Sequence, residues 1–241
     1  MCTVTIIPKG LNDFVLTSNR DEAPNRESLA PELKIYKDVS LLYPEDKLSS
    51  GTWIGVSEQH RTLCLLNGGF ELHRRQAPYR QSRGVVVKDL LACTDVVDTI
   101  ETYNFSNIEP FTLVIVDYNV QLCFYELVWD GTNAHFKQLA HEPHIWSSAT
   151  LYTQDMKAER QQWFTDFKAQ NALNADTLLN FHKTAGADII GYGVIMDRGV
   201  VKTTSITQVE KTVDSLTMRY ESLKDTSVSI ETFKSPQIIN E

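Results

Sequence analysis

The second residue of the chain, Cys2, is placed for nucleophilic chemistry because it directly follows the initiator Met1. Cysteine is small enough for the initiator methionine to be removed, and the thiol and the new α-amine would then share one residue. The unperturbed pKa is about 8.5 for a thiol and about 7.7–8.0 for an α-amine, so the amine can accept the thiol proton near neutral pH. We therefore predict that Met1 is removed and that Cys2 is the most reactive thiol. A small, buried and inert cysteine is the alternative.

A second group of polar residues, Asn19-Arg20-Asp21-Glu22, follows the strand-like segment 14–18. The segment 2–7 is also strand-like, and turn-forming residues at 8–13 separate the two, which predicts a hairpin. The end of the second strand then lies beside the start of the first, and Asp21 or a neighbour comes close to the Cys2 amine. A carboxylate there would hold and orient an α-ammonium. The alternative is a solvated turn that carries an Arg-Asp pair.

The hydrophobic pattern of the rest of the chain predicts strands, helices, strands, helices and strands in that order. Strands are predicted at 51–57, 61–67, 111–116, 121–129, 135–139, 193–196, 200–209 and 216–223. Helices are predicted at 83–92, from an N-cap at 94–95 to about 103, at 155–170 with Trp163, Phe164 and Phe167 buried, and after the cap Asn174 with Leu178, Leu179 and Phe181 inward. Residues 22–50 are predicted to be irregular with at most one short strand, and 224–241 to be frayed. The order suits two stacked antiparallel sheets with helices outside and no domain boundary.

Composition excludes several classes of function. The chain has 241 residues, 42% apolar and 22% charged, with a net charge of −8. An acidic protein without clustered Lys and Arg is not expected to bind nucleic acid. No apolar run approaches the roughly 20 residues of a membrane span, and no secretory signal is visible, which favours the cytoplasm. The four cysteines show no metal-binding spacing, so we expect free thiols, no metal and no cofactor.

Other residues have a weaker claim to a role. The six histidines (His60, His73, His135, His141, His144 and His182) share no helical face or metal spacing and are expected on the surface or in loops. Arginines and a histidine between His73 and Arg83 form a local basic segment that could meet a ligand carboxylate or phosphate, although a solvated loop is the simpler interpretation. Trp53 and Trp146 could line an apolar pocket or belong to the core.

Four short segments of the sequence together resemble a known family. Met1-Cys2-Thr3, Asn19-Arg20-Asp21-Glu22, Gly51-Thr52-Trp53-Ile54-Gly55 and Leu65-Leu66-Asn67 are similar to the NRDE family, also called the transport and Golgi organisation 2 family. Weaker similarity covers 146–149 and 201–205. That family in turn resembles cysteine N-terminal-nucleophile hydrolases such as penicillin V acylase, bile salt hydrolase and acid ceramidase. The resemblance implies an α+β fold, a four-layer αββα sandwich over a single domain, residues 1–241, with Cys2 at the end of a central strand.

The resemblance also assigns roles. Cys2 matches the nucleophile, Asp21 the aspartate that holds its amine, and Asn67 an oxyanion-hole asparagine. Asn19 matches as well, whereas Ser18 stands at the position of the hydrolases' arginine and leaves Arg20 as its substitute. Ser148 falls near the second asparagine and Lys202 near a late arginine. Ser148 donates from a shorter side chain, and Lys202 keeps a positive charge without the bidentate fork of arginine.

Two functions from different classes follow. The first is a hydrolase of non-peptide carbon–nitrogen amide bonds, with a small-molecule amide as substrate. The second is a binding or trafficking protein on the same fold that carries an apolar, anionic ligand such as haem or an acyl lipid. The family is linked to secretory-pathway organisation and to the movement of such molecules. The positions at which this chain departs from the hydrolases, Ser148 and Lys202, are the reason for considering the binding or trafficking function.

Overall fold

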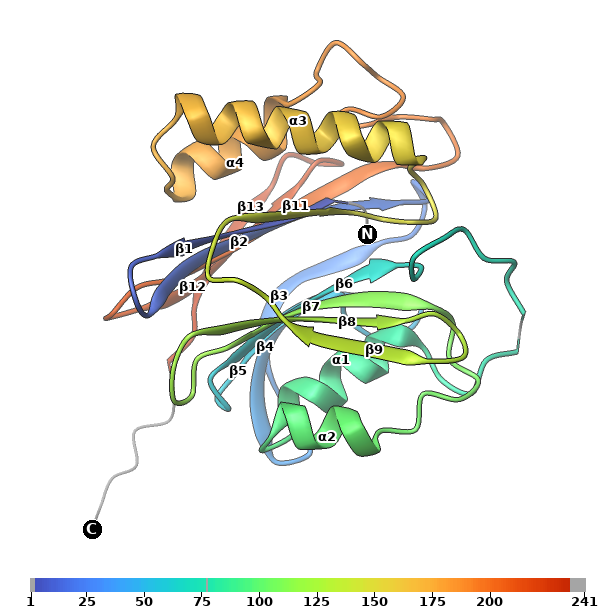
Figure 1. Cartoon of the computed structure of the whole chain (residues 1–241), viewed down its shortest axis with the longest axis vertical. Coiled ribbons are helices and arrows are strands. Elements are labelled where there is room, and N and C mark those ends of the chain that lie inside the picture. The colour runs from blue at the N-terminus through green and yellow to red at the C-terminus, as the bar shows by residue number, and fades with distance from the viewer. Residues whose placement is uncertain (1–2, 77, 235–241) are drawn as a thin grey trace.

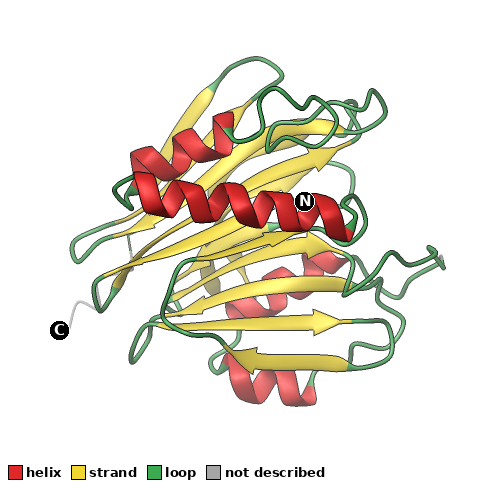
Figure 2. Ribbon diagram, turned by 45° about the horizontal axis from the view of Figure 1, so that its top comes forward, coloured by secondary structure: helices red, strands yellow, loops and turns green. Residues whose placement is uncertain are grey.

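Two antiparallel β-sheets packed face to face form the centre of the computed structural model, which describes residues 3–76 and 78–234. A pair of helices covers the outer side of each sheet, so the layers run helix, sheet, sheet, helix (Figures 1 and 2). The predicted four-layer αββα sandwich is therefore confirmed. Cys2 lies outside the described residues.

The first sheet, sheet A, is built around the N-terminal hairpin. Its strand order is β10-β1-β2-β11-β12-β13, with every neighbouring pair antiparallel. The strands are β1 (Thr3–Lys9), β2 (Asp13–Glu22), β10 (His144–Ser147), β11 (Lys202–Lys211), β12 (Leu216–Ser222) and β13 (Val228–Thr232). The predicted hairpin of the first two strands is confirmed, and β2 lies between β1 and β11.

Sheet B contains the strands of the middle of the chain in the order β3-β4-β5-β6-β7-β8-β9. They are β3 (Ser28–Tyr36), β4 (Val39–Asp46), β5 (Ile54–Ser57), β6 (Arg61–Asn67), β7 (Phe111–Asp117), β8 (Cys123–Trp129) and β9 (Ala134–Gln138). Each strand pairs with the next one in the chain, although β6 and β7 are joined by a long segment, 68–110, that contains two helices.

The helices are α1 (Arg83–Ala92) and α2 (Val96–Thr102) on sheet B, and α3 (Gln154–Gln170) and α4 (Ala175–Thr184) on sheet A. The predicted caps are present, because Asp95 accepts from two backbone N–H groups of α2 and Asn174 forms a capping box with Thr177. None of the described helices is long and apolar enough to cross a membrane.

The apolar interior is divided by sheet A. A large cluster of buried residues fills the space between the sheets and extends to α1, and it includes Ile6, Leu16 and Leu113. A smaller cluster lies between sheet A and the helices α3 and α4 and includes Ile7, Phe164 and Phe181. The smaller cluster leaves room on that side for buried polar residues.

Several sequence predictions are wrong in detail. Residues 22–50 contain two strands, β3 and β4. Their prolines, Pro31 and Pro44, do not prevent the pairing because they lie where the ladder between the two strands is interrupted. Residues 193–196 form no strand, and β13 lies in the segment predicted to fray. The short edge strand β10 was not expected. Trp163 and Leu179 are only partly buried, whereas their neighbours Phe164 and Leu178 are fully enclosed.

Candidate functional site

The candidate site is built where β2 ends beside the beginning of β1. Thr3 pairs with Asn19 in the β1–β2 hairpin, and on the other side of β2 Asp21 pairs with Thr203 of β11. One peptide bond separates Thr3 from Cys2, which the structure does not describe. The described residues around this point therefore form the surroundings of the start of β1.

Successive residues of β2 point to opposite sides of sheet A, as in any strand. Asn19 and Asp21 contact the helix side, through α4 and through Tyr152 before α3. Arg20 contacts the opposite side, where it binds Asp46 of sheet B. Three neighbouring residues of the sequence motif thus enter two separate environments, which we call the helix face and the inter-sheet face of sheet A.

The carboxylate of Asp21 is buried on the helix face and both of its oxygens are held. Tyr152 Oη donates to Oδ2 at 2.6 Å, and Thr203 Oγ1 donates to Oδ1 at 2.6 Å. The Thr203 hydroxyl also accepts from the backbone N–H of Met196 at 2.9 Å. The guanidinium of the buried Arg160 lies 3.7 Å from the centre of the Tyr152 ring. These contacts fix the carboxylate in one orientation near the end of β2.

Asn19 belongs to a second set of buried polar groups on the same face. Its amide nitrogen donates to the carbonyls of Val194 at 2.7 Å and of His182 at 3.0 Å. Its oxygen accepts from His182 Nδ1, so the other ring nitrogen, Nε2, is the acceptor of the Thr5 hydroxyl at 2.7 Å. Burial, together with the positive charge of Arg160, lowers the pKa of His182 to about 3. His182 is therefore a neutral, fully bonded histidine that joins α4 to β1 and β2.

His182 was expected on the surface or in a loop, and that expectation is wrong. The residue is fully buried on α4 next to Phe181. The signal was present in the spacing, because Leu178, Phe181 and His182 occupy one face of a ten-residue helix. Tyr152, Arg160 and Thr203, which complete the surroundings of Asp21 and Asn19, carry no comparable signal because they are distant from these residues in the sequence.

Arg20 lies on the inter-sheet face in an ion-pair cluster. Its Nη2 donates to Asp46 Oδ2 at 2.6 Å, and Arg26 Nε donates to the same oxygen at 2.8 Å. Burial by itself raises the pKa of the Asp46 carboxyl, but the hydrogen bonds and charge of Arg26 lower it below its ordinary value. The guanidinium of Arg20 also lies 4.7 Å from the centre of the Trp53 ring. Arg20 is thus held by sheet B rather than placed beside Asp21.

Asn67, the last residue of β6 in sheet B, contacts Ser148, which directly follows β10 of sheet A. Ser148 Oγ donates to the main-chain carbonyl of Asn67 at 2.8 Å and bonds to the Thr150 hydroxyl at 3.0 Å. Gly68 has a φ of +85°, and a Cβ on it would lie 2.8 Å from Thr150 Cγ2. Only glycine fits this contact without strain. The hydroxyl proton of Ser148 is therefore used to hold the Asn67 segment in place.

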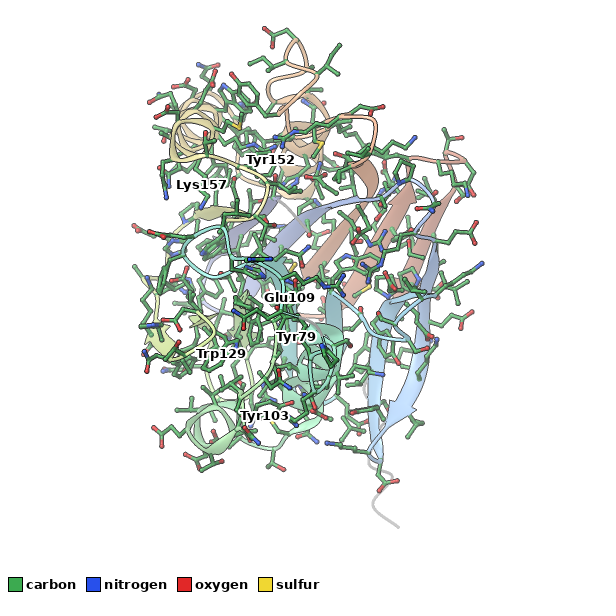
Figure 3. The ribbon with its side chains drawn as sticks, turned by 90° about the vertical axis from the view of Figure 1, so that its right-hand side faces the viewer. Tyr79, Tyr103, Glu109, Trp129, Tyr152 and Lys157 are labelled. Atoms are coloured by element: carbon green, nitrogen blue, oxygen red, sulfur yellow. The ribbon has the colours of Figure 1, made fainter. Side chains whose placement is uncertain are left out.

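Two cavities open on either side of the end of β2. The first, which we call the arginine cavity, measures about 600 Å³ and includes Arg20, Trp53, Asn67, Tyr79, Arg83 and Glu109 in its wall. The second, the Lys202 cavity, measures about 610 Å³ and includes Ile190, Ile195, Met196, Lys202, Thr203 and Tyr220. Arg26 lines both. In Figure 3, Tyr79 and Glu109 lie on the α1 side and Tyr152 on the side of α3 and α4.

The structure therefore brings together part of the predicted set. Asn67 and Arg20 share the arginine cavity, and Asn19 and Asp21 share the helix face. Lys202, the first residue of β11, lies opposite Glu22 in the backbone register of β2 and β11. It also lines the other cavity. Among the described residues, no group of His, Cys, Asp or Glu side chains is arranged to hold a metal ion.

Three cysteines, Cys64, Cys93 and Cys123, lie in the described part of the chain. Burial raises the pKa of the Cys64 thiol to about 12. Cys123 is buried and Cys93 is half-buried, and neither forms a disulfide. Cys64 is therefore a protonated core residue at neutral pH.

Comparisons with known proteins agree with this architecture. Residues 1–222 match the family described as transport and Golgi organisation 2. Comparison with curated proteins gives no match to this chain.

Among solved structures, the fold is similar to a Caenorhabditis elegans orthologue of N-acylethanolamine-hydrolyzing acid amidase, with a TM-score of 0.59 and 9% identity over 86% of this chain and 92% of that one. Penicillin V acylase from Agrobacterium tumefaciens has a TM-score of 0.54 and 12% identity over 96% of this chain and 86% of that one. A variant of conjugated bile acid hydrolase from Clostridium perfringens has a TM-score of 0.52 and 11% identity over 97% of each chain. At these identities the likeness shows the fold alone.

Proposed function

The chain belongs to the transport and Golgi organisation 2 family, and from this premise we propose that it is a hydrolase of non-peptide carbon–nitrogen amide bonds. The nucleophile is the thiol of Cys2 after removal of Met1. Solved proteins of similar fold include an amidase, an acylase and a bile acid hydrolase, which supports the reaction class. A small-molecule amide is the substrate class.

The observation that carries this proposal is the orientation of Asp21. Its carboxylate is 2% exposed, lies on the strand that pairs with β1, and has one hydroxyl donor on each oxygen. A buried carboxylate costs free energy unless it is paired and bonded. Such an anion at the start of β1 is suited to hold an α-ammonium, which is the role of the orienting group in a nucleophile–base–orienter set.

The reaction proceeds in two balanced steps. In the first, the Cys2 sulfur attacks the amide carbonyl carbon and its proton passes to the α-amine. The carbon–nitrogen bond then breaks, and the leaving amine takes that proton and departs, which leaves an acyl-thioester. In the second step, water attacks the thioester and gives its proton to the α-amine. The carbon–sulfur bond then breaks, the acid leaves, and the proton returns to the thiolate.

The other residues of the set support these steps from their places in the fold. The Asn67 amide, with a backbone N–H, stabilises the oxyanion that forms at the carbonyl oxygen. Ser148 holds the Asn67 segment, and Asn19 and Arg20 hold the two faces of β2. Lys202 carries a positive charge at the wall of the neighbouring cavity.

Trapping of the acyl-enzyme tests the proposal. Untagged protein, with Met1 removed, is incubated with short-chain and long-chain N-acyl amides and with a β-lactam, and its intact mass is measured. We expect an added mass equal to the acyl group, located on Cys2 by peptide mapping and lost in Cys2→Ala. The matched control Cys93→Ala should still be acylated. An adduct that persists in Cys2→Ala, or no adduct with any of these substrates, contradicts the proposal.

The second candidate function is a carrier that binds an apolar, anionic ligand without turnover. One observation favours it: the hydroxyl of Ser148 donates to a main-chain carbonyl instead of facing a substrate. A hydrolase fold with a weakened oxyanion hole would retain binding while losing rate. Titration with haem and with an acyl-CoA separates the cases, because a carrier binds saturably and returns the ligand unchanged, whereas the hydrolase becomes acylated by amide substrates.

A further inference from the structure

Two further cavities share one lysine at the amino-terminal half of α3. The first measures about 360 Å³ and is lined by residues of α3, of the edge strand β10 and of strands β7 and β8. The second measures about 370 Å³ and is lined by the segment 149–153 that leads into α3. Phe70, Glu71, Gln154 and Lys157 line both cavities, which together we call the Lys157 groove. Tyr152 also lines the second cavity, near Lys157 (Figure 3).

Helix α3 presents Lys157 to this groove from an anchored backbone. Gln154, Lys157 and Gln161 all line the first cavity, and their spacing of three and four residues puts them on one face of the helix. The buried residues of α3 fasten the helix to sheet A, because Arg160 donates to the hydroxyl of Thr3 and Phe164 packs in the smaller apolar cluster. The place of Lys157 in the groove wall is therefore set by the fold.

The side chain of Lys157 has no ion-pair or hydrogen-bond partner within residues 3–76 and 78–234. It is half-buried, and burial lowers the pKa of its ammonium group without an opposing effect from a neighbouring carboxylate. Removal from water disfavours the charged form of an amine that has no counter-charge. The neutral form of lysine is a nucleophile, and desolvated lysines are the ones that form Schiff bases with carbonyl compounds.

The charges of the groove do not favour an anionic ligand. Apart from Lys157, the charged residues among those that line the two cavities are the carboxylates Glu71 and Glu126. Glu126 is bound by Lys137 at 2.8 Å and by Trp146 Nε1 at 2.6 Å, and Glu71 is exposed. The groove wall therefore has no surplus of positive charge, and a neutral ligand suits it better than an anion.

Apolar side chains form much of the remaining wall. Phe70 is 52% exposed and Leu72 is 73% exposed, although both residues line a cavity. Val128 and Trp146 contribute to the first cavity and Leu151 to the second. An apolar group that enters the groove would remove part of this surface from water, which favours binding.

From this arrangement we infer that the Lys157 groove is a covalent binding site for an apolar aldehyde, with the amine of Lys157 as the nucleophile. The neutral amine attacks the carbonyl carbon, and one N–H proton moves to the carbonyl oxygen to give a carbinolamine. The hydroxyl then leaves with the second N–H proton as water, so that one amine and one aldehyde give one imine and one water. The step uses neither Cys2 nor Asp21, and the site is therefore separate from the proposed hydrolase.

Reductive trapping tests the inference. The Cys2→Ala variant is used, because an amino-terminal cysteine would itself condense with aldehydes. The protein is incubated at pH 7 with a limiting amount of hexanal and with cyanoborohydride, and peptide mapping locates the alkylated residues. We expect Lys157 to be alkylated at least about tenfold faster than Lys168, an exposed lysine of the same helix, since each unit by which a pKa falls raises the neutral fraction about tenfold. Equal rates at the two lysines overturn the inference.

Matched substitutions locate the site and its apolar wall. Lys157→Arg should remove the fast-reacting position and leave the other rates unchanged, whereas the control Lys168→Arg should leave the fast position intact. Phe70→Ala should slow trapping of hexanal at Lys157 by about threefold or more, with little effect on acetaldehyde, because it removes exposed apolar surface from the wall. Leu33→Ala, an exposed site on β3, is its control. Equal slowing of both aldehydes, or of neither, contradicts an apolar site.

An acidic aldehyde, glyoxylate, separates this site from one that attracts anions. The preference for Lys157 over Lys168 should be at least about threefold smaller with glyoxylate than with hexanal, because the groove wall has no cationic surplus. Trapping of hexanal at Lys157 should also reach half of its maximal rate at a pH below the ordinary lysine pKa of about 10.4. An equal preference for glyoxylate, or half-maximal trapping at or above that pH, overturns the inference.

Discussion

The two faces of β2 differ in how completely their polar groups are satisfied. On the helix face, the side chains of Asn19 and Asp21 are bonded to His182, Tyr152 and Thr203. On the inter-sheet face, the hydroxyls of Ser205 and Thr207 of the neighbouring strand β11 are buried without a partner among the described residues.

This difference separates two kinds of contribution from one short motif. A closed, bonded network fixes the position of its members and tolerates little change. The inter-sheet face, in contrast, borders the arginine cavity through Arg20 and so has room for a ligand beside it. We therefore interpret the helix face as the part that positions Asp21, and the inter-sheet face as the part that receives the substrate.

Asp21→Asn should have the largest effect, because it removes the charge that orients the proposed nucleophile's amine. The rate of Cys2 acylation is expected to fall roughly 10³–10⁴-fold. Tyr152→Phe removes one of the hydroxyl donors to the same carboxylate and should cost about tenfold. Stopped mass-spectrometric sampling of the acyl-enzyme measures both rates. Unchanged acylation in Asp21→Asn would show that the closed face has no part in the chemistry.

The helix face should also control acid stability through His182. The native state keeps this histidine neutral with a pKa of about 3, whereas the unfolded chain protonates it below its ordinary pKa of about 6.5. The unfolded state therefore binds the extra proton, and stability falls as the pH decreases from about 6.5 toward 3. The slope due to this group is roughly 1.4 kcal/mol per pH unit.

Urea unfolding of the wild type and His182→Gln between pH 7 and pH 4 checks this effect. Glutamine keeps a donor and an acceptor but cannot be protonated in this range. The variant should be the less stable form at pH 7, and the difference should narrow as the pH falls. Parallel curves would mean that His182 is not the titrating group.

In the wall of the arginine cavity, Gly84→Ala should destabilise the protein by about 1–3 kcal/mol, because the new methyl group meets the backbone of Thr52 at a distance that forces α1 to shift. The matched control is Gly191→Ala, since a Cβ there has nothing within 4 Å. Chemical denaturation gives the free energies of unfolding. Equal stabilities of the two variants would argue that α1 is not held against the wall of the cavity.

The smallest effect is expected at Ser148. Ser148→Ala removes one hydrogen bond to the Asn67 carbonyl and should cost about 1 kcal/mol of stability, with less than a tenfold change in acylation. Asn67→Ala, in contrast, should lower the acylation rate by about 10²–10³-fold as a lost oxyanion donor. If both substitutions slow acylation equally, Ser148 itself faces the substrate and its role here is wrong.

The parts of the fold that sequence predicts well are local. The helix at 83–92 and the turn-linked strands follow from spacing and turn residues in one stretch of chain. The strands β3 and β4 escape prediction because their prolines resemble loop residues and become compatible with a sheet only at an interrupted ladder. The edge strand β10 has four residues and pairs with β1, far away in sequence, so its identity depends on tertiary contact.

The same division applies to the site. Alternation along β2 separates Asn19 and Asp21 from Arg20, but the pattern does not reveal which face meets the helices. His182 was predictable from its helical spacing, whereas the pairing of Asp21 with Tyr152 and Thr203 joins residues more than 130 and 180 positions apart. Cys2 lies outside the described residues, so its role remains a prediction.

A crystal structure of the Cys2→Ala variant with a bound short-chain N-acyl amide tests the division between the two faces most directly. We expect the amide in the arginine cavity, with its carbonyl oxygen in hydrogen-bond distance of the Asn67 side chain. The bonds of Asp21 to Tyr152 and Thr203 should stay as they are. An amide in the Lys202 cavity or on the helix face would contradict this account.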